Sequence, residues 1–308
     1  MTFDDLKARL RLPVVDAPMF LVSGPDLVIA AGCAGILGAF PALNARSTDE
    51  LREWLGRIEG ALADFPYAVN LIVQGTGAPR YLDDLALIQA VKPPVVITSV
   101  GQPAEAVTRV HAFGGLVFHD VTTVRHARKA IEAGVDGLIL VTAGAGGHTG
   151  VANPFAFVSQ LREFWNGPIL LGGGISDGRG VLAARALGAD LVYMGTRFAA
   201  SRESLASDAY KQLLVSETMA DVVTTERVSG LPANFLRGSI ARAGLDPDAL
   251  PERLGVFKPD LPEGLKPWRD IWSGGHGVGS IVDAPPVAEI VERLVAGYDA
   301  ARAAAKAL

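Results

Sequence analysis

Cysteine is nearly absent from this sequence: Cys33 is the only one in 308 residues. A single thiol excludes an internal disulfide framework and a thiolate metal cluster, so we expect no metal site of that kind. Basic residues are also in slight deficit, with 28 Lys and Arg against 33 Asp and Glu and a net charge of −5. Nucleic-acid binding requires a dense basic face, and this balance therefore argues against a nucleic-acid partner.

Long apolar runs are missing as well. None approaches the roughly 18 residues that span a bilayer, and the opening MTFDDLKARLRL lacks the apolar core of a signal peptide. We therefore expect a cytoplasmic protein without a membrane partner. Hydrophobic residues make up 49% of the chain, which is too apolar for disorder. The length suits one barrel of roughly 250 residues with an insertion, or two domains of about 150, so length alone does not choose.

Short β-branched apolar runs alternate with amphipathic stretches over the first two thirds of the chain. The runs with strand character are Pro13–Met19, Gly35–Pro41, Tyr67–Val73, Pro94–Val100, Leu116–Val121, Gly137–Thr142, Pro168–Gly174 and Leu191–Phe198. The helical stretches between them are Gly24–Ala34, Ser47–Leu62, Arg80–Val91, Ala104–Phe113, Val124–Ala133, Phe155–Trp165 and Gly178–Leu187. Parallel strands buried on both faces have this texture. Eight such strands and seven helices predict an α/β fold, a closed (β/α)8 TIM barrel, with an open doubly wound sheet as the alternative.

The texture changes after Phe198, where helical pieces such as Ser207–Met219 alternate with Pro- and Gly-rich connections. We expect residues 201–275 to form a helical and loop insertion after strand 8 that covers the active-site mouth. Residues 1–200 and 276–308 then form the barrel, with Pro285–Leu308 as its last amphipathic helix.

Two glycine-rich strand ends indicate a phosphate site. The first reads Leu171-Gly172-Gly173-Gly174 and opens a helix; the next strand ends Met194-Gly195-Thr196. Glycines let backbone N–H groups approach an anion, and a helix N-terminus adds a favourable dipole. Either run alone is equally explained as a tight turn, but barrels commonly hold a phosphate where strands 7 and 8 end. A GxGxxG dinucleotide site is disfavoured, because no acidic residue closes the following strand to hold a ribose.

The loop after the sixth strand, Val141-Thr142-Ala143-Gly144-Ala145-Gly146-Gly147-His148-Thr149-Gly150, holds the main catalytic candidate. Small residues around His148 leave room for a planar ligand, and an imidazole titrates near neutrality, as a general base requires. A purely structural loop histidine is the alternative. His276, in a late glycine-rich loop, is a second candidate that would contact substrate. His111 and His126 fall on the solvated faces of helices.

Taken together, AGAGGHTG, GGGISDG, YMGTRF and Asp16-Ala17-Pro18-Met19 resemble the nitronate monooxygenase family, formerly called 2-nitropropane dioxygenases. The resemblance covers nearly the whole chain. It implies an FMN-dependent barrel that uses O2 to oxidise a small molecule, an alkyl nitronate or nitroalkane, to a carbonyl compound and nitrite. His148 matches the catalytic histidine. The residues that would line or hold FMN are Ala17, Pro18, Met19, Asn70, His119, Gly146, Gly147, Gly172, Gly173, Gly174, Met194, Gly195 and Thr196.

Two departures from the family's pattern leave the natural substrate open. Relatives often carry a glutamate in the lead-in to the histidine loop, where this chain has Val141-Thr142-Ala143-Gly144. The late segment reads GGHGVG, with His276 where a glutamine is expected. Both lie where substrate would contact the protein.

Three other functions compete with nitronate oxidation. The first is an NAD(P)H-dependent FMN reductase acting on a quinone or an enoyl substrate. The second is a purine-nucleotide dehydrogenase barrel, which needs a cysteine nucleophile in a barrel loop, whereas Cys33 lies in the first helical stretch. The third is a non-enzymatic protein that stores or senses FMN. The sequence does not fix the oligomeric state, and a homodimer is compatible with it.

Overall fold

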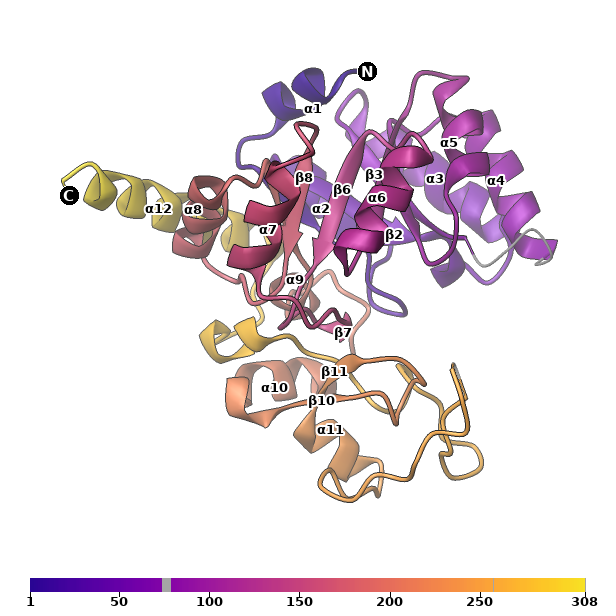
Figure 1. The fold of residues 1–308 in the computed structure, drawn as a ribbon, viewed down its shortest axis with the longest axis vertical. Coiled ribbons are helices and arrows are strands. Elements are labelled where there is room, and N and C mark those ends of the chain that lie inside the picture. The colour runs from indigo at the N-terminus through magenta and orange to yellow at the C-terminus, as the bar shows by residue number, and fades with distance from the viewer. Residues whose placement is uncertain (74–78, 257, 308) are drawn as a thin grey trace.

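The fold is an eight-stranded parallel barrel closed between its first and last strands (Figure 1). The computed structural model describes residues 1–73, 79–256 and 258–307. The barrel order is β1-β2-β3-β4-β5-β6-β8-β9, with β1 paired to both β2 and β9. The strands are β1 (Val14–Asp16), β2 (Leu37–Pro41), β3 (Tyr67–Ile72), β4 (Val95–Ser99), β5 (Leu116–Val121), β6 (Gly137–Val141), β8 (Ile169–Gly172) and β9 (Leu191–Met194). The predicted TIM barrel is confirmed, and every predicted strand is present.

The helices of the outer layer follow the strands in alternation. They are α2 (Pro25–Cys33), α3 (Thr48–Leu62), α4 (Pro79–Val91), α5 (Ala104–His111), α6 (Val124–Glu132), α7 (Pro154–Arg162), α8 (Gly178–Leu187) and α12 (Val287–Ala305). Side-chain caps start several of them: Ser47, Thr123 and Asp177 each accept a hydrogen bond from a backbone N–H of the first turn. Gly188 ends α8 in the left-handed conformation, which glycine adopts without a Cβ penalty.

A short amino-terminal helix, α1 (Phe3–Arg9), closes one end of the barrel. Leu6 is fully buried in the cluster of side chains that fills the barrel interior, together with Leu37, Ile97 and Phe118. Phe3 packs edge-on against Phe118 with ring centroids 6.0 Å apart. The strand pattern does not predict α1, although its capping box between Thr2 and Asp5 is a recognisable helix start.

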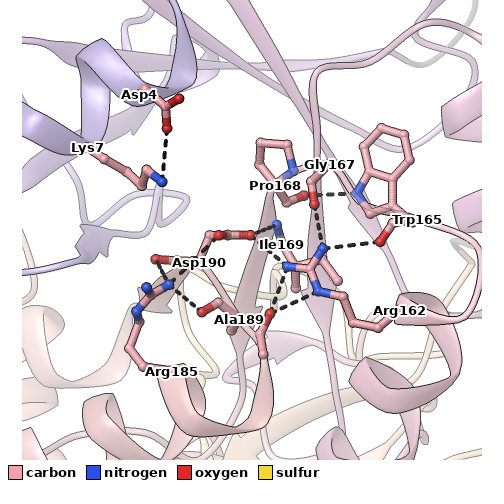
Figure 2. A network of polar contacts seen from close by, with 11 residues as sticks. Asp4, Lys7, Arg162, Trp165, Gly167, Pro168, Ile169, Arg185, Ala189 and Asp190 are labelled. Carbon is pink, nitrogen blue, oxygen red and sulfur yellow. Dashed lines mark hydrogen bonds and ion pairs between the residues drawn. The ribbon is translucent and has the colours of Figure 1, made fainter.

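A polar network ties the amino-terminal ends of β8 and β9 to α7 (Figure 2). The Arg162 guanidinium donates to the carbonyls of Gly167 and Gly188 at 2.7 Å and pairs with Asp190 at 2.7 Å. Asp190 also accepts from the backbone N–H of Ile169 at 2.9 Å. Arg162 therefore provides hydrogen-bond donors for the carbonyls of Gly167 and Gly188, and Arg185 does the same for those of Ala189 and Asp190.

The segment after β9 differs in detail from the expected helices and loops. The last barrel strand stops at Met194, and its predicted continuation forms a helical turn, α9 (Thr196–Ala199). The helices α10 (Asp208–Ser216) and α11 (Arg237–Arg242) are accompanied by two antiparallel strands, β10 (Val222–Thr225) and β11 (Ala233–Leu236). The β-branched run of β10 is typical of a strand. The domain division at residues 200 and 276 stays a prediction.

In Figure 1 this segment lies below the barrel, next to β7 (Gly147–His148), with which β11 pairs. The short η3 (His276–Ser280) then leads back toward α12. None of the helices in the described parts of the chain is both long and apolar enough to cross a bilayer.

Candidate active site

One cavity of about 970 Å³ lies at the carboxyl ends of the barrel strands, where barrel enzymes carry their active sites. His148 and the whole set of predicted cofactor residues line this cavity. From the first half of the chain these are Ala17, Pro18, Met19, Asn70 and His119; from the second half they are Gly146, Gly147, His148, Gly172, Gly173, Gly174, Met194, Gly195 and Thr196. Tyr210, Leu231, Pro232, Trp268 and Ser273 add a wall from the segment after β9.

The glycine-rich end of the cavity suits a phosphate. Gly173 has φ +130°, and a Cβ there would collide with Oγ1 of Thr142, so this position requires glycine. Oγ1 of Thr196 accepts from the N–H of Gly275 at 3.0 Å, which leaves its own hydrogen to donate to a ligand. The N–H of Gly174 instead donates to the carbonyl of Gly144 at 3.2 Å, so this amide holds the neighbouring loop.

A chain of hydrogen bonds fixes Asn70 on β3. Its Nδ2 donates to Oγ of Ser99 at 2.7 Å and to the carbonyl of Ile97 at 3.2 Å. Ser99 in turn donates to Oδ2 of Asp120 at 2.5 Å. Because both amide hydrogens are used, Oδ1 of Asn70 is left as the acceptor for a ligand. Sequence reasoning missed Ser99, since only the pairing of β4 with β3 brings it beside Asn70.

Two carboxyl groups lie at this end of the barrel with incomplete hydrogen bonding. Within the described residues, neither oxygen of Asp16 has a hydrogen-bond partner, nor does Oδ1 of Asp120. Burial raises the pKa of Asp120 to about 7, although the hydrogen bond from Ser99 opposes the shift. Burial also raises the pKa of Asp16 well above its usual range. Burial therefore favours the protonated form of Asp16, and Asp120 is close to half ionised at pH 7.

His119, at the end of β5, is buried and uncharged. Its Nδ1 lies 2.8 Å from Oγ1 of Thr98, and burial lowers the pKa of the imidazole to about 4. A neutral ring offers one nitrogen as a donor and the other as an acceptor. His119 therefore offers hydrogen bonds to a ligand in the cavity without adding a positive charge.

His148 is held by residues far away in the sequence. It belongs to β7, where it pairs with Ala233 of β11, and Nδ2 of Asn234 donates to the carbonyl of Ala145 at 2.7 Å. The imidazole also contacts Trp268 in an edge-to-face arrangement, with ring centroids 5.0 Å apart and an interplanar angle of 87°. The ring is exposed within the cavity, yet the surrounding walls displace bulk water, and this desolvation lowers its pKa.

The loop after β1 is anchored by Asn44, another residue that sequence reasoning missed. Its Nδ2 donates to the carbonyls of Met19 at 2.9 Å and Ser23 at 2.7 Å, while its Oδ1 accepts from the N–H of Leu21 at 2.8 Å. These bonds support the left-handed conformation of Leu21, at φ +62°. Ala17, Pro18 and Met19 are thereby presented to the cavity as a fixed stretch of backbone.

His276 is placed differently from the other predicted site residues. It is not among the described residues that line the cavity. Its N–H donates to the carbonyl of Gly144 at 2.9 Å, and its side chain packs where Gly144 has no Cβ. Ser273 and Gly277, on either side of His276 in the sequence, do line the cavity. The glycine-rich loop that contains His276 therefore borders the cavity largely through its backbone. Substrate contact by His276 stays a prediction.

These features fit a flat cofactor that carries one phosphate. At the phosphate end, glycines stand where a Cβ would collide with neighbouring atoms, and the Thr196 hydroxyl is close by. Asn70 and His119 offer hydrogen bonds along the cavity wall. In the described parts of the chain, no three His, Cys, Asp or Glu side chains are grouped so that they could hold a metal ion. Comparison with known proteins identifies the class: the chain is a flavin-dependent oxidoreductase.

The family follows from the sequence itself. The profile of the nitronate monooxygenase family matches residues 5–297, and the chain belongs to that family. The resemblance seen in the motifs is thus confirmed over nearly the whole chain.

Individual relatives cover two kinds of chemistry. A nitronate monooxygenase of Paraburkholderia phytofirmans is 28% identical over 92% of this chain and 91% of its own. A (3aS,4S,5R,7aS)-5-hydroxy-7a-methyl-1-oxo-octahydro-1H-indene-4-carboxyl-CoA dehydrogenase of Rhodococcus jostii is 30% identical over 75% of this chain, and the match spans 64% of that relative's length.

Two solved structures are similar over almost their full length. The nitroalkane oxidase of Streptomyces ansochromogenes has a TM-score of 0.82 at 26% identity, covering 97% of this chain and 99% of its own. FabK of Thermotoga maritima has a TM-score of 0.80 at 28% identity, covering 98% of this chain and 97% of its own.

Proposed function

We propose that this protein binds FMN and oxidises alkyl nitronates, and the corresponding nitroalkanes, with O2 to carbonyl compounds and nitrite. The observation that carries the proposal is the position of His148, which lines the same cavity as the glycine-rich phosphate end. The family and the nitroalkane oxidase similarity support the reaction class.

FMN, when bound, supplies the redox chemistry, and the protein supplies placement and electrostatics. Gly173, Gly195 and Thr196 would hold its phosphate by backbone and hydroxyl donors. Asn70 would accept from the cofactor through Oδ1, because its amide hydrogens are engaged elsewhere. The single phosphate site, with no acidic residue closing the following strand, favours FMN over a dinucleotide.

His148 would act as the general base. Since desolvation lowers its pKa, the imidazole is neutral at pH 7 and able to take the α-proton of a nitroalkane. A nitronate is already an anion, so its oxidation requires no base. The two substrate forms therefore separate the proton-transfer role of His148 from cofactor binding.

The test is purification followed by an absorbance spectrum, then oxygen and nitrite assays with propionate 3-nitronate and 2-nitropropane. We expect a yellow protein that releases nitrite with at least the nitronate. A colourless protein that cannot be reconstituted with FMN would contradict the cofactor assignment. A flavoprotein that consumes neither compound would contradict the substrate assignment.

A second candidate is an NAD(P)H-dependent reductase of an enoyl or quinone substrate. It is favoured by the similarity to FabK, which belongs to the enoyl reductases, and to a CoA-thioester dehydrogenase. Anaerobic addition of NADH separates the two activities. Rapid bleaching of the flavin by NADH supports the reductase, whereas bleaching by nitronate alone supports the oxidase.

A further inference from the structure

Trp268 has a backbone conformation that a bulky residue rarely adopts. Its φ is +68°, in the left-handed region, and its N–H donates to the carbonyl of Ile271 at 3.1 Å. A bridge between Pro267 and Ile271 closes the same tight turn. Such a conformation is unfavourable for a residue with a Cβ and persists only where the surroundings impose it. The location of the indole shows what this conformation achieves.

The indole lies between the buried core of the segment after β9 and the catalytic candidate. On one side it packs against Phe235, with ring centroids 5.0 Å apart and an interplanar angle of 30°. On the other it meets the imidazole of His148 edge-to-face at 5.0 Å. Phe235 is fully buried, and its neighbour Ala233 pairs with the backbone of His148. The same small strand and the same turn therefore fix both the backbone and the ring of His148.

We propose that Trp268 is the positioning residue that sets the ring orientation of His148 and shields it from water, so that substrate meets an oriented, neutral imidazole. This inference rests on the proposed role of His148 as the base. Trp268 itself lines the cavity, so its indole also limits the width of the substrate that reaches His148.

Among the described residues, those that pair with the backbone of His148 or pack against its ring are uncharged, and desolvation lowers the pKa of its imidazole. Ala233 and Asn234 face β7 from β11, and Trp268 covers the ring; none of them titrates. The other titratable side chains on the cavity wall are His119, Asp120, His126, Lys129, Tyr193 and Tyr210. Truncating the indole would admit water to the imidazole and leave the set of charges unchanged.

The primary test is an NMR titration of the histidine ring protons in the FMN-loaded protein, with the His148 resonance assigned by its loss in His148→Asn. In the wild type we expect the pKa of His148 to lie below the ordinary value of about 6.5. Trp268→Phe retains an aromatic ring and keeps the low value. Trp268→Ala hydrates the imidazole and moves the pKa up toward 6.5. Where the alanine variant fails to fold, Trp268→Leu takes its place, with a smaller rise expected.

The matched control is Trp272→Phe. Trp272 belongs to the same segment but stacks on Tyr210, with ring centroids 5.1 Å apart, and donates from Nε1 to the carbonyl of Arg269. This variant should leave the pKa of His148 unchanged. An equal shift in Trp272→Phe would mean that general loosening of the segment, and not the indole of Trp268, controls the imidazole.

Kinetics give the second readout. Trp268→Ala should lower kcat for the neutral nitroalkane about tenfold or more, with a much smaller effect on the nitronate, and Trp268→Phe should restore most of the loss. An unchanged pKa of His148 in Trp268→Ala, or equal losses on both substrate forms, would overturn the proposal. Absence of turnover in the wild type would instead contradict the proposed function, while the titration would still test the contact between the rings.

Discussion

Ser99 donates its hydroxyl hydrogen to Oδ2 of Asp120 across 2.5 Å, and this single bond is the only polar support of that carboxyl group within the described residues. Burial outweighs the bond and raises the pKa of Asp120 to about 7. In the unfolded chain the same carboxyl has a pKa of about 3.9. Folding therefore takes up a proton between these two values.

The consequence is a stability that falls as pH rises. The contribution of Asp120 is fully present below about pH 4 and is lost as pH rises through about 7. Its upper bound is about 4 kcal/mol, from roughly three pKa units at 1.36 kcal/mol each. Asp120→Asn should remove most of this slope and be more stable than the wild type at pH 8. Urea unfolding at pH 5 and pH 8, at one FMN concentration, measures the unfolding free energy of both proteins. An equal change in unfolding free energy between the two pH values in wild type and Asp120→Asn would refute the prediction.

Replacement of His148 by asparagine should separate cofactor binding from proton transfer. We expect His148→Asn to retain FMN and to lose most turnover with neutral nitroalkanes, by about 10²-fold, which corresponds to roughly 3 kcal/mol. His111→Asn is the control, because His111 is exposed and pairs with Asp136 on the outer surface. Steady-state oxygen consumption measures the effect. Unchanged turnover in His148→Asn would remove the assignment.

The hydroxyl of Thr196 should contribute directly to cofactor affinity. Thr196→Val removes a donor that the hydrogen bond from Gly275 leaves available, and the Kd for FMN should rise about five- to tenfold, or roughly 1–1.5 kcal/mol. Quenching of FMN fluorescence measures it. In Thr108→Val the lost hydroxyl bonds only within α5, so the Kd should not change; a similar loss there would point to an indirect effect.

Gly173 should tolerate no side chain. Its φ of +130° and the collision of a Cβ with Thr142 mean that Gly173→Ala distorts the phosphate end, and we expect FMN affinity to fall more than tenfold. Gly56 has open space around it within α3, so Gly56→Ala should keep FMN affinity and stabilise the fold by about 0.5–1 kcal/mol. Equal FMN binding by Gly173→Ala and wild type would contradict this account.

The Arg162 network should be worth far more than a surface ion pair. Arg162→Met removes the guanidinium donors to the carbonyls of Gly167 and Gly188 and the close ion pair of Asp190, at an expected cost of about 3 kcal/mol in unfolding free energy. The side chain of Arg179 is 83% exposed where it pairs with Asp177, so Arg179→Met should cost less than about 0.5 kcal/mol in unfolding free energy. Thermal or urea unfolding measures the loss of unfolding free energy in Arg162→Met and in Arg179→Met. Similar losses in the two variants would show that the Arg162 network contributes little to stability.

The barrel could be predicted because each strand is a local apolar run bounded by helix caps and glycines. The apolar pattern of such a run involves only residues that are adjacent in the sequence. Strands such as Tyr67–Ile72 and Leu116–Val121 can therefore be predicted without the structure. The glycines and His148 could be predicted to share a site because their motifs are contiguous, and they line one cavity; their roles stay predictions. In contrast, α1 was missed because only one of its residues, Leu6, is buried, and a single apolar position gives no periodicity.

The supports of the site could not be predicted, since they come from distant parts of the chain. Ser99 reaches Asn70 through the register of β3 and β4, and Trp268 reaches His148 from 120 positions further along. Neither residue has a motif of its own. The β10–β11 pair was also missed, because a β-branched run of four residues in a region rich in turns is too short to distinguish from a loop.

Helix α1 covers one end of the barrel, where Leu6 packs among the interior side chains. The cavity lined by His148 and Trp268 lies at the opposite, carboxyl ends of the strands, so the substrate and O2 of the proposed reaction would reach the site from that side.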